Sequence, residues 1–131
     1  MSGGGLRAPA TMEILLVRHA IAEEFPPRAG DGDRDRPLTD AGAGRFRRIA
    51  RVLAAVWDPP ELVLASSYAR AWQTALILEQ EVGWAAPEAC PELEPANPPA
   101  AVLDVLGARA AADRVVLVGH APMISGRLSL L

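Results

Sequence analysis

Three short apolar runs constrain the fold of this 131-residue chain more than any other feature. They are residues 13–18 (EILLVR), residues 58–67 (DPPELVLASS, a turn followed by a strand) and residues 114–120 (RVVLVGH). Continuous apolar runs of this length are typical of strands that are buried on both faces of a parallel sheet. The segments between and after them have helical patterns at 38–57, 68–83, 100–112 and 122–131. The alternation predicts an α/β fold, a three-layer αβα sandwich with a mostly parallel sheet.

The first predicted helix carries the clearest local signals. Thr39 stands where a helix N-cap is expected, because its hydroxyl can accept a hydrogen bond from an N–H group of the first turn. Phe46, Ile49, Leu53 and Val56 follow at the three- and four-residue spacing of one helix face. We expect this face to pack on the sheet.

Two segments lack a periodic pattern and are expected to be loops. Residues 23–38 are rich in Pro, Gly and charge, and a long loop of this kind inside a small domain is often functional. Residues 86–99 are proline-rich, and we expect a short strand within them at 91–93. Residues 1–11 are expected to form a flexible tail, which leaves 12–131 as a single domain.

The composition excludes several functional classes. A net charge of −3 argues against a general nucleic-acid-binding protein, which is normally basic. Cys90 is the only cysteine, so the chain has neither an internal disulfide nor a cysteine-based metal site. No apolar run approaches the roughly 18 residues that a membrane span needs, and the first residues lack the apolar core of a secretory signal. We therefore expect a cytoplasmic protein.

Cationic and potentially cationic side chains follow two of the three predicted strands. Arg18 and His19 end the first strand, and His120 ends the third. Because ligands of open α/β sheets bind at the carboxyl ends of the strands, these side chains are expected to meet at one edge. Arg70 lies just after the second strand, near the start of a helix whose free N–H groups attract anions. The combination predicts an anion site, and arginine is well suited to phosphate.

Other kinds of site are less consistent with the residues present. Ser66 and Ser67 follow the second strand, and we expect them to cap the next helix rather than act as nucleophiles. The chain has neither the G-x-S-x-G pattern of α/β-hydrolases nor a P-loop. Two histidines without neighbouring carboxylates make a poor metal site, so no metal or other cofactor is expected.

Four motifs together resemble the histidine phosphatase superfamily, the phosphoglycerate-mutase-like group. They are LVRHA at 16–20, RPLTDAG at 36–42, ASSYARAWQTA at 65–75 and LVGHAP at 117–122. Within that group they most resemble the small phosphohistidine phosphatases of the SixA type. The resemblance implies the phosphoglycerate-mutase-like fold and covers residues 13–126.

The resemblance also implies a role for each of four residues. His19 would be the nucleophile that becomes phosphohistidine, and Arg18 and Arg70 would hold the phosphoryl oxygens. His120 would contact the same group and stabilise the transition state. Water would then hydrolyse the intermediate without a metal ion, because the arginines supply the positive charge. His19 must be neutral to attack, and bound phosphate and the arginines shift its pKa in opposite directions; the sequence leaves open which of the two dominates.

The chain departs from the resembling family at the expected general acid. Relatives that cleave phosphoesters carry a glutamate in the third loop, where this chain has Pro95, with Glu94 and Glu92 beside it. An alkoxide leaving group needs a proton donor, whereas the leaving nitrogen of a phosphoramidate can be protonated beforehand. The expected substrate is therefore a phosphohistidine on a partner protein, with Glu94 or Glu92 as an alternative acid.

Further features of the resemblance leave alternatives open. Arg36 either pairs with a carboxylate such as Asp33 or meets the substrate, and we favour the structural role. The family continues beyond the helix that follows VGHAP, so we expect a C-terminally shortened domain with one exposed sheet edge. Two other functions remain: a phosphatase of the same mechanism for a small phosphorylated metabolite, and an inactive phosphate-binding module.

Overall fold

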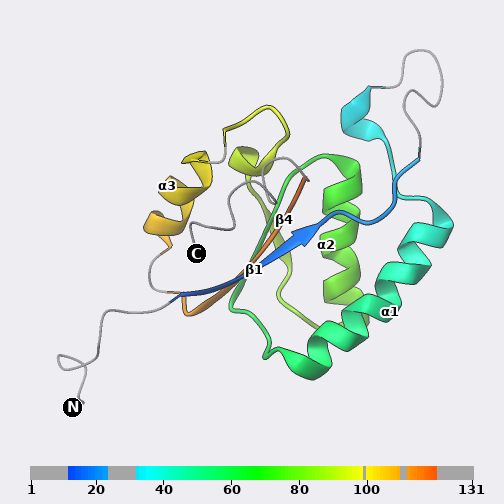
Figure 1. Cartoon of the computed structure of the whole chain (residues 1–131), viewed down its shortest axis with the longest axis horizontal. Coiled ribbons are helices and arrows are strands. Elements are labelled where there is room, and N and C mark those ends of the chain that lie inside the picture. The colour runs from blue at the N-terminus through cyan, green and yellow to red at the C-terminus, as the bar shows by residue number, and fades with distance from the viewer. Residues whose placement is uncertain (1–11, 24–31, 99, 110–111, 121–131) are drawn as a thin grey trace.

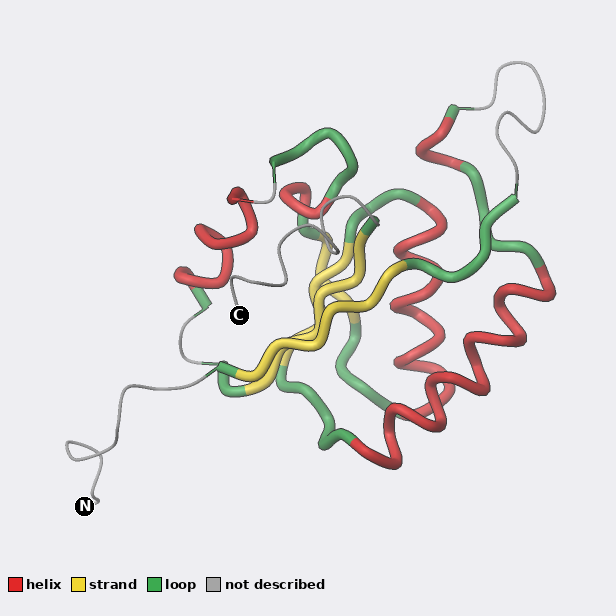
Figure 2. Tube along the Cα trace, in the orientation of Figure 1, coloured by secondary structure: helices red, strands yellow, loops and turns green. Residues whose placement is uncertain are grey.

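The computed structural model describes residues 12–23, 32–98, 100–109 and 112–120. The tail expected at 1–11, residues 24–31 of the loop expected at 23–38 and the helix expected at 122–131 lie outside these residues. Figure 1 shows the arrangement of the helices and strands, and Figure 2 shows the same view coloured by secondary structure.

A parallel sheet of four strands forms the centre of the described structure. Its strands lie in the order β1-β4-β2-β3, and all three pairings are parallel. The bounds are β1 Glu13–Arg18, β2 Leu62–Ala65, β3 Pro87–Ala89 and β4 Arg114–Gly119. The predicted α/β class and the mostly parallel sheet are therefore confirmed. β1 was expected to be buried on both faces, but it is an edge strand of the described sheet and only Val17 in it is fully buried.

Helices cover both faces of the sheet, which gives the predicted three layers (Figures 1 and 2). Helices α1 (Asp40–Val56) and α2 (Ala69–Val82) lie together on one face. Helix α3 (Ala100–Ala108) lies on the other face, near a short 3-10 helix, η3 (Pro91–Leu93). A further 3-10 helix, η2 (Asp33–Asp35), precedes α1.

The expectation of a short strand at 91–93 is wrong. The strand of this region is β3 at Pro87–Ala89, and residues 91–93 form η3. Pro91 explains the difference, because proline has no N–H group for a strand ladder but suits the first turn of a helix. The backbone N–H of Cys90 makes the last bond to β2, at 2.8 Å from the carbonyl oxygen of Ala65.

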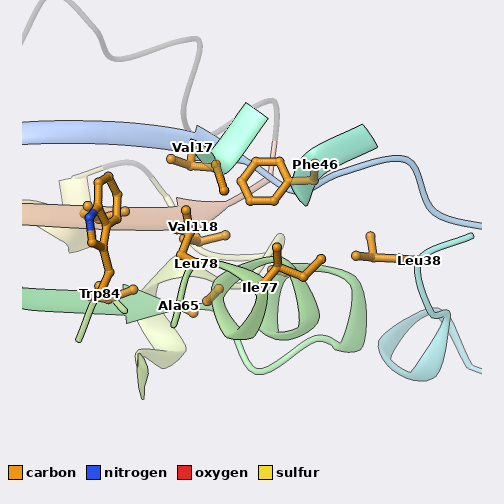
Figure 3. Packing of buried hydrophobic residues seen from close by; sticks show 13 residues of the cluster. Val17, Leu38, Phe46, Ala65, Ile77, Leu78, Trp84 and Val118 are labelled. Atoms are coloured by element: carbon orange, nitrogen blue, oxygen red, sulfur yellow. The ribbon is translucent and has the colours of Figure 1, made fainter. Parts of the chain in front are cut away.

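Side chains alternate between two cores along each central strand. In β4, Val116 and Val118 pack toward α1 and α2, and Figure 3 shows Val118 beside Leu78. Val115 and Leu117 of the same strand pack into the second core, with α3. A strand between two helical layers needs an apolar residue at every position, which explains the unbroken apolar runs.

Helix α1 begins as predicted but packs through different residues. The Thr39 hydroxyl accepts a hydrogen bond from the N–H of Gly42 at 2.8 Å, so the predicted cap is confirmed. A Cβ atom added to Gly42 would lie 2.4 Å from the carbonyl oxygen of Ile21, so only glycine fits there without a shift. The expected packing face is wrong in part, because Ile49 is 41% exposed and Val56 is 74% exposed.

The residues of α1 that are buried are spaced four apart. They are Gly42, Phe46 and Ala50. Two of the three are small, and small residues allow the helix backbone to approach its neighbours closely. The large apolar residues of α1 therefore lie partly outside the face through which the helix packs.

The single cysteine has no sign of reactivity. Cys90 is buried in the second core, and its thiol lies 3.5 Å from a carboxylate oxygen of Glu92. Burial and the Glu92 charge raise the pKa of the thiol to about 11.

No helix among the described residues is long and apolar enough to cross a membrane.

Candidate active site

The two histidines lie side by side at the carboxyl ends of neighbouring strands. Arg18 of β1 is in register with Gly119 of β4, so His19 and His120 follow paired positions. The backbone N–H of His19 donates to the carbonyl oxygen of Gly119 at 3.0 Å. The centroids of the two imidazole rings are 5.2 Å apart, with the rings tilted by 58°. The parallel topology thus brings together two side chains that are about 100 positions apart in the sequence.

The hydrogen bond of His19 defines which ring nitrogen is available for reaction. Its Nδ1 lies 2.7 Å from the carbonyl oxygen of Ala20. A carbonyl oxygen only accepts, so Nδ1 carries the proton and Nε2 has a free electron pair whenever the ring is neutral. The N–H of Ala20 donates in turn to the Thr74 hydroxyl at 3.0 Å, which fixes this turn of the chain against α2.

The pKa of His19 is lowered below its ordinary value. Burial contributes most, and the hydrogen bond to Ala20 acts against it. The charges of Arg70, Arg18 and Arg36 lower the pKa further, in that order. In the structure without phosphate, the lowered pKa favours the neutral ring of His19 at neutral pH, which is the form that a nucleophile needs.

His120 is more completely enclosed than His19. It is 3% exposed, and its Nε2 lies 3.0 Å from the Ser66 hydroxyl. The ring of Tyr68 meets it edge-on, with centroids 5.5 Å apart. Burial, followed by the charge of Arg70, lowers the pKa of His120 to about 4. Its Nδ1 is buried and has no hydrogen-bond partner in the described part of the chain.

Arg70 lies in the first turn of α2 and is 5% exposed. Its Nη1 donates to the main-chain oxygen of Asp33 at 2.9 Å, and its Nη2 donates to the Asp33 carboxylate at 3.1 Å. The guanidinium also lies 5.3 Å from the centre of the Tyr68 ring. The Nε atom is buried and has no partner among the described residues, so it remains a donor for an anion.

Asp33 joins Arg70 to Arg36, and sequence reasoning missed its contact with Arg70. Its second carboxylate oxygen accepts from Arg36 Nη2 at 2.9 Å and Nε at 3.2 Å. Burial opposes ionisation of Asp33, but the hydrogen bonds from Arg36 and Arg70 outweigh it and lower the pKa of this carboxyl. The predicted pairing of Arg36 with Asp33 is thus confirmed.

Arg18 differs from the other site residues because its side chain is exposed. Strand alternation directs it away from Val17, which packs on the face that α1 covers. No residue in the described part of the chain pairs with its guanidinium, but its charge is close enough to lower the pKa of His19. Arg18 and His19 also line a groove of about 690 Å³ between β1 and α1, together with Arg36 and Arg45. His120 and Arg70 do not line this groove, which therefore lies on the His19 side of the histidine pair.

The two serines after β2 do not cap α2 as expected. The N-cap is Tyr68, and no side chain makes the cap hydrogen bond. The Ser66 hydroxyl is occupied by His120 and by the N–H of Tyr68. The Ser67 hydroxyl donates to the Glu94 carboxylate at 2.8 Å, so both hydroxyls have partners other than the helix.

Glu94 lies at the rim of the site in a small polar network. Arg34 Nη2 donates to the Ser67 hydroxyl at 2.9 Å and lies 3.5 Å from the Glu94 carboxylate. The guanidinium of Arg34 also lies 4.9 Å from the centre of the Tyr68 ring, which in turn touches His120. Among the described residues, no group of three or more His, Cys, Asp or Glu side chains could hold a metal ion.

The α/β fold brings two histidines and a buried arginine together at the strand ends, which is the cluster that the motifs predicted. The sequence model of the histidine phosphatase superfamily (branch 1) matches residues 14–97. The chain belongs to this superfamily.

Individual relatives agree with this assignment. An uncharacterized protein of Picosynechococcus sp. is 37% identical over 113 residues, which are 85% of this chain and 67% of that protein. The structure is similar to that of a protein assigned as the phosphohistidine phosphatase SixA of Agrobacterium tumefaciens, with a TM-score of 0.81 and 28% identity over 94% of this chain and 77% of the other. It is also similar to the protein histidine phosphatase SixA complexed with tungstate, with a TM-score of 0.80 and 27% identity over 90% and 75% of the two chains. The predicted likeness to the SixA type is confirmed.

Proposed function

We propose that the chain is a phosphatase that forms a phosphohistidine on His19, and that its substrate is a phosphohistidine side chain of a partner protein. The observation that carries the proposal is the hydrogen bond from His19 Nδ1 to the carbonyl oxygen of Ala20. It leaves Nε2 with a free electron pair in a ring that burial and three arginines keep neutral.

The reaction follows from the positions of the charged groups. Nε2 of His19 attacks phosphorus in line and the bond from phosphorus to the leaving imidazole nitrogen breaks. The leaving imidazole has taken a proton from water beforehand, so it departs as a neutral ring. Arg70 Nε and His120 Nδ1 are buried and have no hydrogen-bond partner among the described residues, and they bind the equatorial oxygens together with Arg18. Water then attacks the phosphohistidine and releases inorganic phosphate. The arginines supply the positive charge that a metal ion supplies in other phosphatases, so no cofactor is used.

The contacts of Glu94 support a phosphoramidate rather than an ester as the substrate. Ser67 donates a hydrogen bond to its carboxylate, and Arg34 forms an ion pair with the same carboxylate at 3.5 Å. Glu94 would have to leave Arg34 before it could hold a proton for a leaving alkoxide. A leaving imidazole of phosphohistidine takes its proton more readily, so it does not require this acid. Glu92 is engaged with the Cys90 thiol instead.

A small phosphomonoester is the second candidate, because Glu94 still lies at the rim and its side chain is 21% exposed. The Glu94→Gln variant separates the two. If esters are the substrate, the variant should lose hydrolysis of an alkyl phosphate and retain that of an aryl phosphate, whose leaving group needs no acid. If phosphohistidine is the substrate, its dephosphorylation should be unchanged.

The decisive experiment compares the wild type with His19→Ala. Phosphate release is measured from a phosphohistidine-bearing protein and from an aryl phosphate, and the folded state of both proteins is checked by circular dichroism. We expect release by the wild type only, with a trapped phosphoenzyme whose label is stable in base and lost in acid. A folded wild type that releases no phosphate from either substrate contradicts the proposal and favours a phosphate-binding module.

A further inference from the structure

Ser66 is a buried polar residue that contacts His120 and takes no part in the proposed reaction. It follows β2 directly, is 0% exposed, and its N–H donates to the carbonyl oxygen of Val118 at 3.1 Å. Its hydroxyl has two neighbours, the N–H of Tyr68 at 3.1 Å and Nε2 of His120 at 3.0 Å. The backbone bonds on both sides fix this hydroxyl as a rigid contact for the imidazole.

The hydrogen-bonding capacity of the hydroxyl selects one tautomer of His120. The Tyr68 N–H can only donate, so Ser66 accepts from it and keeps its own hydrogen for another acceptor. Nε2 of His120 is that acceptor when the proton of the neutral ring is on Nδ1. With the proton on Nε2 instead, Ser66 would accept twice and its own hydrogen would be left without an acceptor among the described residues. The first arrangement leaves one buried group without a partner among the described residues, the Nδ1–H of His120. The second leaves two, the Ser66 hydrogen and the Nδ1 electron pair, so the first arrangement is favoured.

In the selected tautomer the proton is on Nδ1, the ring nitrogen that no described residue contacts through a hydrogen bond. Nδ1 of His120 is buried and has no partner in the described part of the chain. The ring is neutral at neutral pH because its pKa is lowered to about 4. A neutral ring donates one hydrogen bond only, so the choice of nitrogen decides whether His120 can donate to a bound anion.

We propose that Ser66 is a positioning residue: its hydroxyl donates to Nε2 of His120 and holds the neutral ring with its proton on Nδ1, ready to donate to a phosphoryl oxygen. The last step rests on the proposed phosphatase function. The choice of tautomer does not, and it can be measured without substrate.

The first test is nitrogen NMR of the uniformly labelled wild-type chain at pH 7.5. The chain has two histidines, so His19→Asn assigns both rings. We expect His120 to have its proton on Nδ1, and addition of inorganic phosphate to shift that nitrogen more than Nε2. A proton on Nε2 of His120 in the wild type overturns the proposal without any variant of Ser66.

The second test removes the hydroxyl. In Ser66→Ala, the Nε2–H tautomer of His120 should appear, and kcat for phosphate release should fall about tenfold with a smaller change in KM, as expected for one misdirected hydrogen bond. Ser67→Ala is the matched control for the tautomer, because that hydroxyl contacts Glu94 and not His120. An unchanged tautomer in folded Ser66→Ala contradicts the proposal. If the wild type releases no phosphate, the proposed function fails, while the NMR result still decides the role of Ser66.

Discussion

The buried, neutral state of His120 predicts an acid-sensitive step in the stability of the fold. In the unfolded chain the imidazole has its ordinary pKa of 6.5, and in the folded chain the pKa is about 4. Between these values the unfolded state binds more protons than the folded state. Stability therefore falls as the pH falls through this window, and the effect is complete below the folded pKa.

The size of the effect follows from the two pKa values. A difference of about 2.5 units corresponds to about 3 kcal/mol when both states are fully protonated. Between pH 7.5 and pH 5 the same linkage relation gives a loss of about 2 kcal/mol, which is a large share of the stability of a small domain. His19 acts in the same direction, because its pKa is lowered as well.

The assay is urea unfolding at several pH values from 7.5 to 5, with the free energy of unfolding obtained by linear extrapolation. His120→Asn removes the titrating group, so its stability should depend less on pH than that of the wild type by about 2 kcal/mol over this range. His19→Asn is the control for the other imidazole. Parallel curves for the wild type and His120→Asn, or an NMR titration of His120 with a midpoint near 6.5, would refute the reasoning.

Three further changes test other contacts. Gly42→Ala should lower the free energy of unfolding by about 1–3 kcal/mol, because the added Cβ has no room. Gly44→Ala should raise it by up to about 1 kcal/mol, because a Cβ there has nothing within 4 Å. Urea unfolding at pH 7.5 compares the two variants, and equal effects would contradict the steric argument. Asp33→Ala should lower kcat/KM about tenfold or more, because the guanidinium of Arg70 loses the charged hydrogen bond that orients it. Steady-state kinetics with Arg70→Ala as the reference checks this. Unchanged kinetics would exclude a role of Asp33 in orienting Arg70. Cys90 should react with a thiol reagent at pH 8 only after unfolding, because it is buried and its pKa is about 11; rapid labelling of the native chain would contradict this.

Features that depend on the pattern of burial could be predicted from the sequence. The three runs that predicted strands correspond to β1, β2 and β4, since a strand between two helical layers is apolar at every position. The meeting of Arg18, His19 and His120 at one sheet edge followed from parallel topology, which brings the carboxyl ends of all strands together. Each of these inferences uses a rule that is independent of loop conformation.

Features that depend on how a loop returns to the sheet could not be predicted. Asp33 and Arg70 are 37 positions apart, and nothing in the spacing of the two residues indicates that the carboxylate orients the guanidinium. The contact of the Ser66 hydroxyl with His120 could not be predicted for a similar reason. A serine before a helix gives the same sequence pattern whether its hydroxyl caps the helix or contacts another side chain. Residue type alone therefore indicated the binding groups of the site but not the groups that orient them.

The arginines of the site have two effects that depend on one another. Arg70 lowers the pKa of both His19 and His120, and its buried Nε has no hydrogen-bond partner among the described residues. In the proposed reaction, the positive charge that attracts a phosphoryl group also keeps His19 unprotonated before the group arrives. Asp33 neutralises part of this charge, but it is shared between Arg70 and Arg36, so the pair retains a net positive charge toward the histidines. Bound phosphate would cancel part of that remainder and raise the pKa of His19, because a nearby anion favours the protonated form of an imidazole.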